Sequence, residues 1–156
     1  MKYFVFFSIV FFGLTTAMAQ EIREYDDEQL SKYAKVMVWA DQRKIEMTTQ
    51  YNNWIKEDEY LGVPRFLELK NAKGDSARFK DIGVTEAELV AFNTIATKYD
   101  SMAGSFMAVY EERIKNEIGA GLYNNLKEDL TYVEVIRNRY QKIYEELATS
   151  KDQSEE

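Results

Sequence analysis

Two stretches of the chain repeat apolar residues with the spacing of a long α-helix. After Asp26 and again after Thr85, the apolar positions advance in alternating steps of three and four residues, which is a heptad pattern. Each stretch continues for about 30 residues, or about 45 Å of helix. The first stripe consists of Leu30, Tyr33, Met37, Ala40, Lys44, Met47, Tyr51 and Trp54, and the second of Leu89, Phe92, Ala96, Tyr99, Ala103, Phe106, Tyr110 and Arg113. The pattern predicts an all-α helical bundle built on two long helices.

Capping sequences mark where the predicted helices begin. In a capping box the cap side chain accepts the backbone N–H at the third helical position, and the Gln or Glu there binds back to the cap. A third box predicts a final helix of medium length from Thr131 to about Ala148. The three boxes pair Asp26 with Gln29, Thr85 with Glu88 and Thr131 with Glu134.

Glycine and proline predict two or three short connecting helices between the long ones. Pro64 suits the first turn of a helix that ends near Lys73, and a further turn or two is expected over 76–81. A break at Gly119–Gly121 precedes another short helix over 122–126. The bundle domain is therefore predicted to span 20–148, and the acidic tail 149–156 is predicted to be disordered.

The two long stretches also resemble each other when the chain is shifted by 59 residues. The shift aligns both capping boxes and both glycine breaks. Two interpretations stay open, a duplicated helical unit or two helices that share only a period. The identities under this shift include Leu30 with Leu89, Tyr51 with Tyr110, Gly62 with Gly121 and Leu67 with Leu126.

Residues 1–19 have the three-part layout of a secretory signal peptide. Lys2 supplies a positive start, residues 4–14 are mostly apolar, and Ala17 and Ala19 stand at the small-residue positions before a cleavage site. The apolar run is much shorter than the roughly 20 residues of a membrane-spanning helix. We therefore expect cleavage after Ala19, a periplasmic or secreted protein, and no membrane span after cleavage.

The composition argues against several classes of function. The chain has no His and no Cys, so it has no imidazole or thiolate for a metal ion, a catalytic base or a nucleophile. Its net charge of −7 disfavours nucleic acids, whose binding depends on neutralising phosphates. We expect no metal, no cofactor and no enzymatic activity; an enzyme that uses carboxylates and tyrosines is the least favoured alternative.

Two sets of apolar residues are candidate binding sites. Val38 and Trp39 depart from the first stripe, so either they are buried on two sides or, with Tyr60, they form an exposed patch for a partner. The other candidate is a cavity for a small apolar ligand or an unfolded peptide, since Met and aromatic side chains adapt to such guests. Its expected lining is Tyr33, Met37, Met47, Tyr99, Met102 and Phe106.

Charged residues on the first stretch are interpreted as structural. Lys44 interrupts the apolar stripe and is expected to pair with Asp41 on the same helix. The acidic run Glu57-Asp58-Glu59 lies where a helix dipole favours cations, and we expect Lys56 and Arg65 to neutralise it.

Two motifs resemble those of a family of small exported helical proteins of bacteria, catalogued as a domain of unknown function of the DUF4168 type. The first is the acidic start at 26–30 followed by Tyr33-Ala34, and the second is Ile82-Gly83-Val84-Thr85 with Glu88, Phe92, Asn93 and Ile95 after it. The resemblance implies an exported helical protein and transfers no activity.

The expected function is that of an exported, non-enzymatic interaction or structural module in the cell envelope or outside the cell. Its partner would be a protein or peptide, and its oligomeric state is left open. The alternative is a chaperone-like binder of an apolar ligand or unfolded peptide in the bundle core.

Overall fold

The computed structural model describes residues 23–73 and 75–152, and every regular element in these ranges is helical, which confirms the predicted fold class. The predicted signal peptide, residues 1–19, lies outside the described residues. The elements are α1 (Asp27–Glu57), α2 (Val63–Ala72), α3 (Ser76–Asp81), α4 (Glu86–Arg113), the π-helical turn η1 (Ile114–Ile118), α5 (Ala120–Tyr132) and α6 (Glu134–Asp152).

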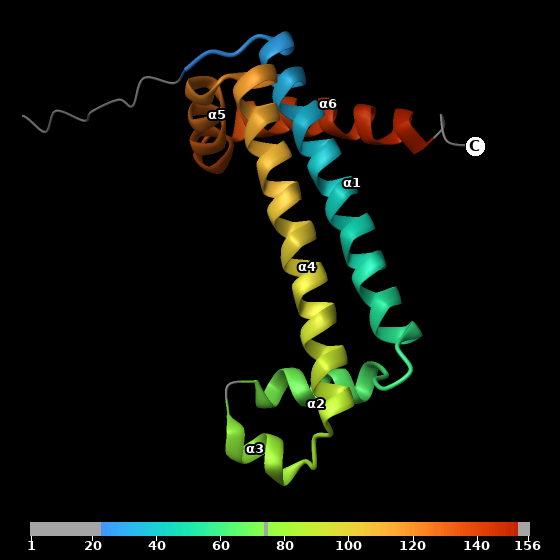
Figure 1. The fold of residues 1–156 in the computed structure, drawn as a ribbon. Helices are drawn as coiled ribbons and strands as arrows, with labels where there is room; N and C mark the ends of the chain where they lie inside the picture. The colour runs from blue at the N-terminus through green and yellow to red at the C-terminus, as the bar shows by residue number, and fades with distance from the viewer. Residues whose placement is uncertain (1–22, 74, 153–156) are drawn as a thin grey trace, which may run out of the picture.

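Helices α1 and α4 lie side by side in opposite directions and form the long axis of the molecule, which we call the shaft (Figure 1). At one end of the shaft lie α2 and α3, and at the other lie α5 and α6. Helix α6 crosses α1, and its C-terminal half projects to one side. None of the helices in the described part of the chain is long and apolar enough to cross a membrane.

Both long helices begin with the predicted capping boxes. Asp26 accepts the N–H of Gln29 at 2.7 Å, and the Gln29 side chain accepts the N–H of Asp26 at 3.1 Å. Thr85 and Glu88 make the equivalent reciprocal bonds at 3.2 and 2.8 Å. Each cap satisfies backbone donors that the first helical turn leaves without partners.

The third predicted capping box is wrong. Thr131 lies inside α5, where its hydroxyl donates to the carbonyl of Lys127 at 3.1 Å, and α6 begins at Glu134. The reason is that Arg137 of α6 donates to the carbonyls of Leu130 and Thr131 at 2.8 and 2.7 Å. These bonds satisfy the C-terminal carbonyls of α5, so this helix extends to Tyr132 instead of ending near residue 126.

Helix α6 also runs further than predicted. It continues from Glu134 to Asp152, past the expected end at Ala148, and the remainder of the predicted tail, 153–156, lies outside the described residues. Lys44 makes its predicted ion pair with Asp41 at 3.0 Å, on the exposed surface of α1.

Most of the buried apolar residues form two cores, one at each end of the shaft. In each core, the start of one long helix packs against the end of the other long helix. The short helix that follows this second long helix completes the core. The core at the α5–α6 end contains Tyr25, Leu30, Tyr33, Val36, Ile118, Leu126 and Ile136. The core at the α2–α3 end contains Ile55, Leu61, Phe66, Leu69, Ala91, Phe92 and Ile95.

Contacts across the shaft repeat under the predicted shift of 59 residues. Lys98 lies over the indole of Trp54 at 5.6 Å, and Arg113 lies over the indole of Trp39 at 4.4 Å. The shift carries Trp39 to Lys98 and Trp54 to Arg113, so it exchanges one pair for the other. Such an exchange is what an approximate two-fold axis through the middle of the shaft produces.

In the short helices that follow the long ones, the shift that aligns the two halves of the chain is 57 residues instead of 59. Gly62 caps α2 and Gly119 caps α5, while Leu69 and Leu126 are each 0% exposed in their cores. The predicted alignments of Gly62 with Gly121 and of Leu67 with Leu126 are therefore wrong, since Leu67 is 50% exposed. The second unit reaches its short helix through Gly119 alone, whereas the first uses the longer linker 58–62.

An edge-to-face aromatic pair also repeats, with Tyr51 shifted by 59 residues to Tyr110 and Phe66 shifted by 57 residues to Tyr123. Tyr51 meets Phe66 with ring centroids 5.8 Å apart and an interplanar angle of 85°, and Tyr110 meets Tyr123 at 6.4 Å and 83°. Each pair joins the last third of a long helix to the short helix that follows it.

Candidate interaction groove

An open groove lies between the α1–α2 linker and the first turns of α4. It encloses a volume of about 660 Å³ and is named here the Tyr60 groove. Its lining consists of Asp58, Tyr60, Glu86, Ala87, Val90, Ala91 and Thr94.

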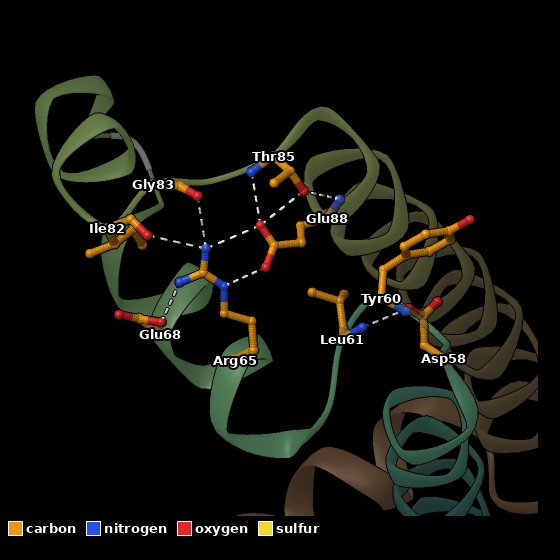
Figure 2. Close-up of polar contacts among 9 residues, drawn as sticks. All are labelled: Asp58, Tyr60, Leu61, Arg65, Glu68, Ile82, Gly83, Thr85 and Glu88. Carbon is orange, nitrogen blue, oxygen red and sulfur yellow. Dashed lines mark hydrogen bonds and ion pairs between the residues drawn. The ribbon is translucent and has the colours of Figure 1, made fainter.

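The linker side of the Tyr60 groove is a turn held by Asp58. The Asp58 carboxylate accepts the backbone N–H groups of Tyr60 and Leu61, both at 3.0 Å (Figure 2). Leu61 is 4% exposed and is fixed in the core, whereas Tyr60 is 54% exposed. The turn therefore keeps the Tyr60 ring at the surface while its neighbour anchors the linker.

The α4 side of the groove begins directly after the Thr85 cap. Val90 is 61% exposed, while the adjacent Ala91 is buried against the core. Because the capping box fixes the first turn of α4, these small and apolar side chains present a defined surface next to Tyr60.

Arg65 of α2 joins the elements around the groove. Its guanidinium makes a two-point ion pair with Glu88 at 2.6 and 3.1 Å and binds Glu68 at 2.5 Å. It also donates to the carbonyls of Ile82 and Gly83 at 3.2 and 3.3 Å (Figure 2). One side chain thus ties α2 to the α3–α4 turn and to the first turn of α4.

At this end of the molecule, Arg65 and Glu88 neutralise each other, whereas the rim of the groove is acidic. The Arg65 guanidinium and the N–H of Thr85 lower the pKa of Glu88 to about 2, and Glu88 raises the pKa of Arg65 above its usual value. The sequence analysis expected Arg65 to neutralise the acidic run at 57–59, but its guanidinium binds Glu68 and Glu88 instead. The rim of the groove carries the carboxylates of Asp58 and Glu86.

The predicted patch of Val38, Trp39 and Tyr60 does not exist as one surface. Val38 is 6% exposed, and Trp39 is half-buried with its ring stacked 5.8 Å from that of Phe106. From Trp39 to the end of α1 the helix advances about 27 Å, so Trp39 and Tyr60 belong to different parts of the molecule. Of the three residues, only Tyr60 lines the groove.

Val38 lies on the stretch of α1 that α6 contacts. Arg139 of α6 binds Asp27 at 2.6 Å, and Tyr144 donates to Asp41 at 2.9 Å. These two contacts bracket the part of α1 that contains Val38, so this residue faces a neighbouring helix rather than solvent.

The six residues predicted to line a ligand cavity are spread along the shaft. Tyr33 belongs to the core at the α5–α6 end, where burial raises its pKa to about 12, and Met37 packs against that core. Tyr99 is 39% exposed, and its ring centroid lies 4.7 Å from that of Tyr51, towards the opposite end of the shaft. The other three follow the shaft between them: Met47 is buried, whereas Met102 and Phe106 are half-buried.

Sequence reasoning missed the α4 side of the groove. Val90 lies off the apolar stripe that contains Leu89 and Phe92, and an apolar residue outside the stripe near the start of the helix was the available signal. Within the described residues, no group of three or more acidic, His or Cys side chains is arranged to hold a metal ion.

Comparison of the chain with protein-family models, with curated proteins and with solved structures found no match. The resemblance to an exported helical family therefore stays an expectation, and a function has to be argued from the geometry of the chain itself.

Proposed function

We propose that the protein is an exported, non-enzymatic interaction module that receives a segment of a protein or peptide partner in the Tyr60 groove. Export rests on the signal-peptide pattern of residues 1–19. The observation that carries the interaction is a hollow of about 660 Å³ beside two large apolar side chains, Tyr60 and Val90, that are more than half exposed.

The rigidity of the groove supports recognition. The Asp58 turn, the Thr85 cap and the Arg65 ion pairs fix its surroundings before any partner arrives. A site that is ordered in advance loses less conformational entropy on binding than a flexible one.

The chemistry of the lining defines the segment that fits. Ala87, Val90 and Ala91 favour an apolar side chain, and the Tyr60 ring gives it an aromatic surface. Asp58 and Glu86 at the rim favour a neighbouring Lys or Arg. The favoured ligand is therefore a large apolar residue next to a basic one.

The charge state of Glu88 argues against a role for this residue as a general acid. A general acid at neutral pH needs a raised carboxyl pKa, and the Glu88 pKa is lowered to about 2 by an ion pair that serves the fold. The alternative of an apolar ligand in the bundle core has weaker support, because its six lining residues are spread from one end core along the shaft.

Selection from a random peptide display library tests the proposal. The wild-type protein without residues 1–19 should enrich peptides that place Lys or Arg beside a large apolar residue. Val90→Glu should abolish this enrichment, because it brings a carboxylate into the apolar part of the groove.

Val135→Glu is the matched control, since Val135 is 70% exposed at the opposite end of the molecule. It should keep the wild-type enrichment. Equal loss in both variants, or enrichment of acidic peptides that Val90→Glu does not affect, would contradict the proposed function.

A further inference from the structure

Both tryptophans of the chain lie on one face of the shaft. We call this surface the tryptophan face; it combines two indoles with cations from the opposite helix. Its residues are Trp39, Arg43, Gln50 and Trp54 from α1 and Lys98, Met102, Phe106, Val109 and Arg113 from α4. Between them, a shallow hollow of about 400 Å³ is lined by Arg43, Gln50, Trp54, Thr97, Lys98, Ser101 and Met102.

Helix α6 contacts a different side of α1. It meets α1 at Asp41, which is two residues from both Trp39 and Arg43. Two residues correspond to a rotation of about 200° around an α-helix, so the tryptophan face points away from α6. Of the helices that the structure describes, α1 and α4 alone run along the middle of the shaft, and Val109 remains 42% exposed there.

The charge of this face differs from that of the whole chain. It carries Arg43, Lys98 and Arg113 in a protein whose net charge is −7. Glu46 binds Arg43 at 2.7 Å and Glu117 lies 3.6 Å from Arg113, so these three cations and two carboxylates leave one net positive charge, next to Lys98. A docking surface of this kind complements a partner that is both apolar and acidic.

The internal two-fold relation repeats this chemistry along the shaft. The shift of 59 residues relates Trp39 to Lys98 and Trp54 to Arg113, so each end of the face presents one indole under one cation. The two tryptophans are separated by about 22 Å along α1. A partner helix of about 15 residues covers that distance.

We propose that the tryptophan face binds an acidic amphipathic helix of a partner protein, which lies in the groove between α1 and α4 and completes a three-helix bundle. The apolar stripe of the partner packs on Met102, Phe106 and Val109, and its flanking carboxylates meet Arg43, Lys98 and Arg113. This site is independent of the Tyr60 groove, which favours a basic partner.

Intrinsic tryptophan fluorescence reads this face alone, because the chain has only two tryptophans. The probe is a synthetic 18-residue helical peptide with Leu at heptad positions and Glu beside them, and its control carries Lys in place of Glu. The Glu peptide should shift the emission of the full-length protein, and of Trp39→Phe and Trp54→Phe separately, since the helix covers both indoles.

Charge reversal supplies the matched variants. The double variant Arg43→Glu, Lys98→Glu should weaken binding of the Glu peptide at least tenfold and gain affinity for the Lys peptide. Lys142→Glu, an exposed change on α6, should leave both affinities unchanged. Circular dichroism of each variant establishes that the helices are retained.

Four results would overturn the proposal. One is equal binding of the Glu and Lys peptides, and another is a response from only one of the two tryptophans. The third is a response to heparin with none to the Glu peptide, which would make the face a site for an anionic glycan. Sedimentation at several concentrations identifies self-association, which would overturn it too if it alone changed the emission.

Discussion

At the scale of single residues, Arg65 decides how the α2–α3 end is held together. Its guanidinium spans three elements, and its carboxylate partner Glu88 also belongs to the capping box of α4. The same ion pair thus stabilises a helix start and the packing of the α2–α3 segment on that helix.

Removing the guanidinium should change both stability and its pH dependence. The Glu88 pKa, about 2 in the folded protein, lies below its ordinary value of 4.5, so ionised Glu88 stabilises the fold above about pH 4.5. This contribution is lost as the pH falls from about 4.5 to about 2. Arg65→Gln should lower the free energy of unfolding at pH 7 and should flatten the acid slope. Urea denaturation at pH 7 and pH 3 measures both effects.

Arg43→Gln is the control for this experiment. Its pair with Glu46 is exposed, so the free energy of unfolding should change by less than about 0.5 kcal/mol. An unchanged acid slope in Arg65→Gln would show that Glu88 does not depend on Arg65.

At the scale of helices, two threonines with the same sequence signature have different roles. Thr85 caps α4, whereas Thr131 lies within α5. Thr85→Ala should cost about 1 kcal/mol of stability, and Thr131→Ala should have nearly no effect or a small favourable one. Thermal unfolding of the two variants compares them directly, and a larger loss in Thr131→Ala would contradict the structural assignment.

Much of this level could be predicted from the sequence, because caps, glycine breaks and apolar periods are local signals. The starts of α1 and α4 follow from Asp26 and Thr85, and the start of α2 follows from Pro64. The predictions that were wrong concern segments whose structure depends on contacts with residues distant in the sequence. Arg137 extends α5 past Thr131, and α6 contacts the stretch of α1 that contains Val38.

The candidate groove was less predictable for the same reason. Tyr60 was proposed from the sequence, but as part of one exposed patch with Val38 and Trp39, which the structure does not form. Val90 and Glu86 come from a separate segment, and they meet Tyr60 only because the chain reverses through α2 and α3. No local pattern specifies that approach.

At the scale of the whole molecule, the two cores lie at opposite ends of the shaft and share no buried residue. Leu69 and Leu126 occupy equivalent places in them, and both are 0% exposed. Replacing either by Ala should cost about 3 kcal/mol, while Leu67→Ala, at a position that is 50% exposed, should cost less than about 1 kcal/mol. Chemical denaturation of the three variants tests the corrected alignment of the repeat.

Hydrogen exchange of Leu69→Ala tests the independence of the two ends. Amides of α2 and of the first turns of α4 should exchange faster, while those near Leu30 and Leu126 should keep most of their protection. Uniform acceleration over the whole chain would indicate a single cooperative unit instead.

The division of the two cores between the repeats has a consequence for any fragment of this protein. A cut between Val84 and Thr85 gives two pieces, and each piece contains one half of both end cores. Neither piece alone can cover its apolar surface. Two identical copies of one piece, related by a two-fold axis with their long helices antiparallel, would each supply the half of a core that the other lacks. A half-length chain should therefore be stable only as a pair, and a single gene fusion of two copies of the first piece would yield an arrangement like that of α1 to α5, without the additional helix α6.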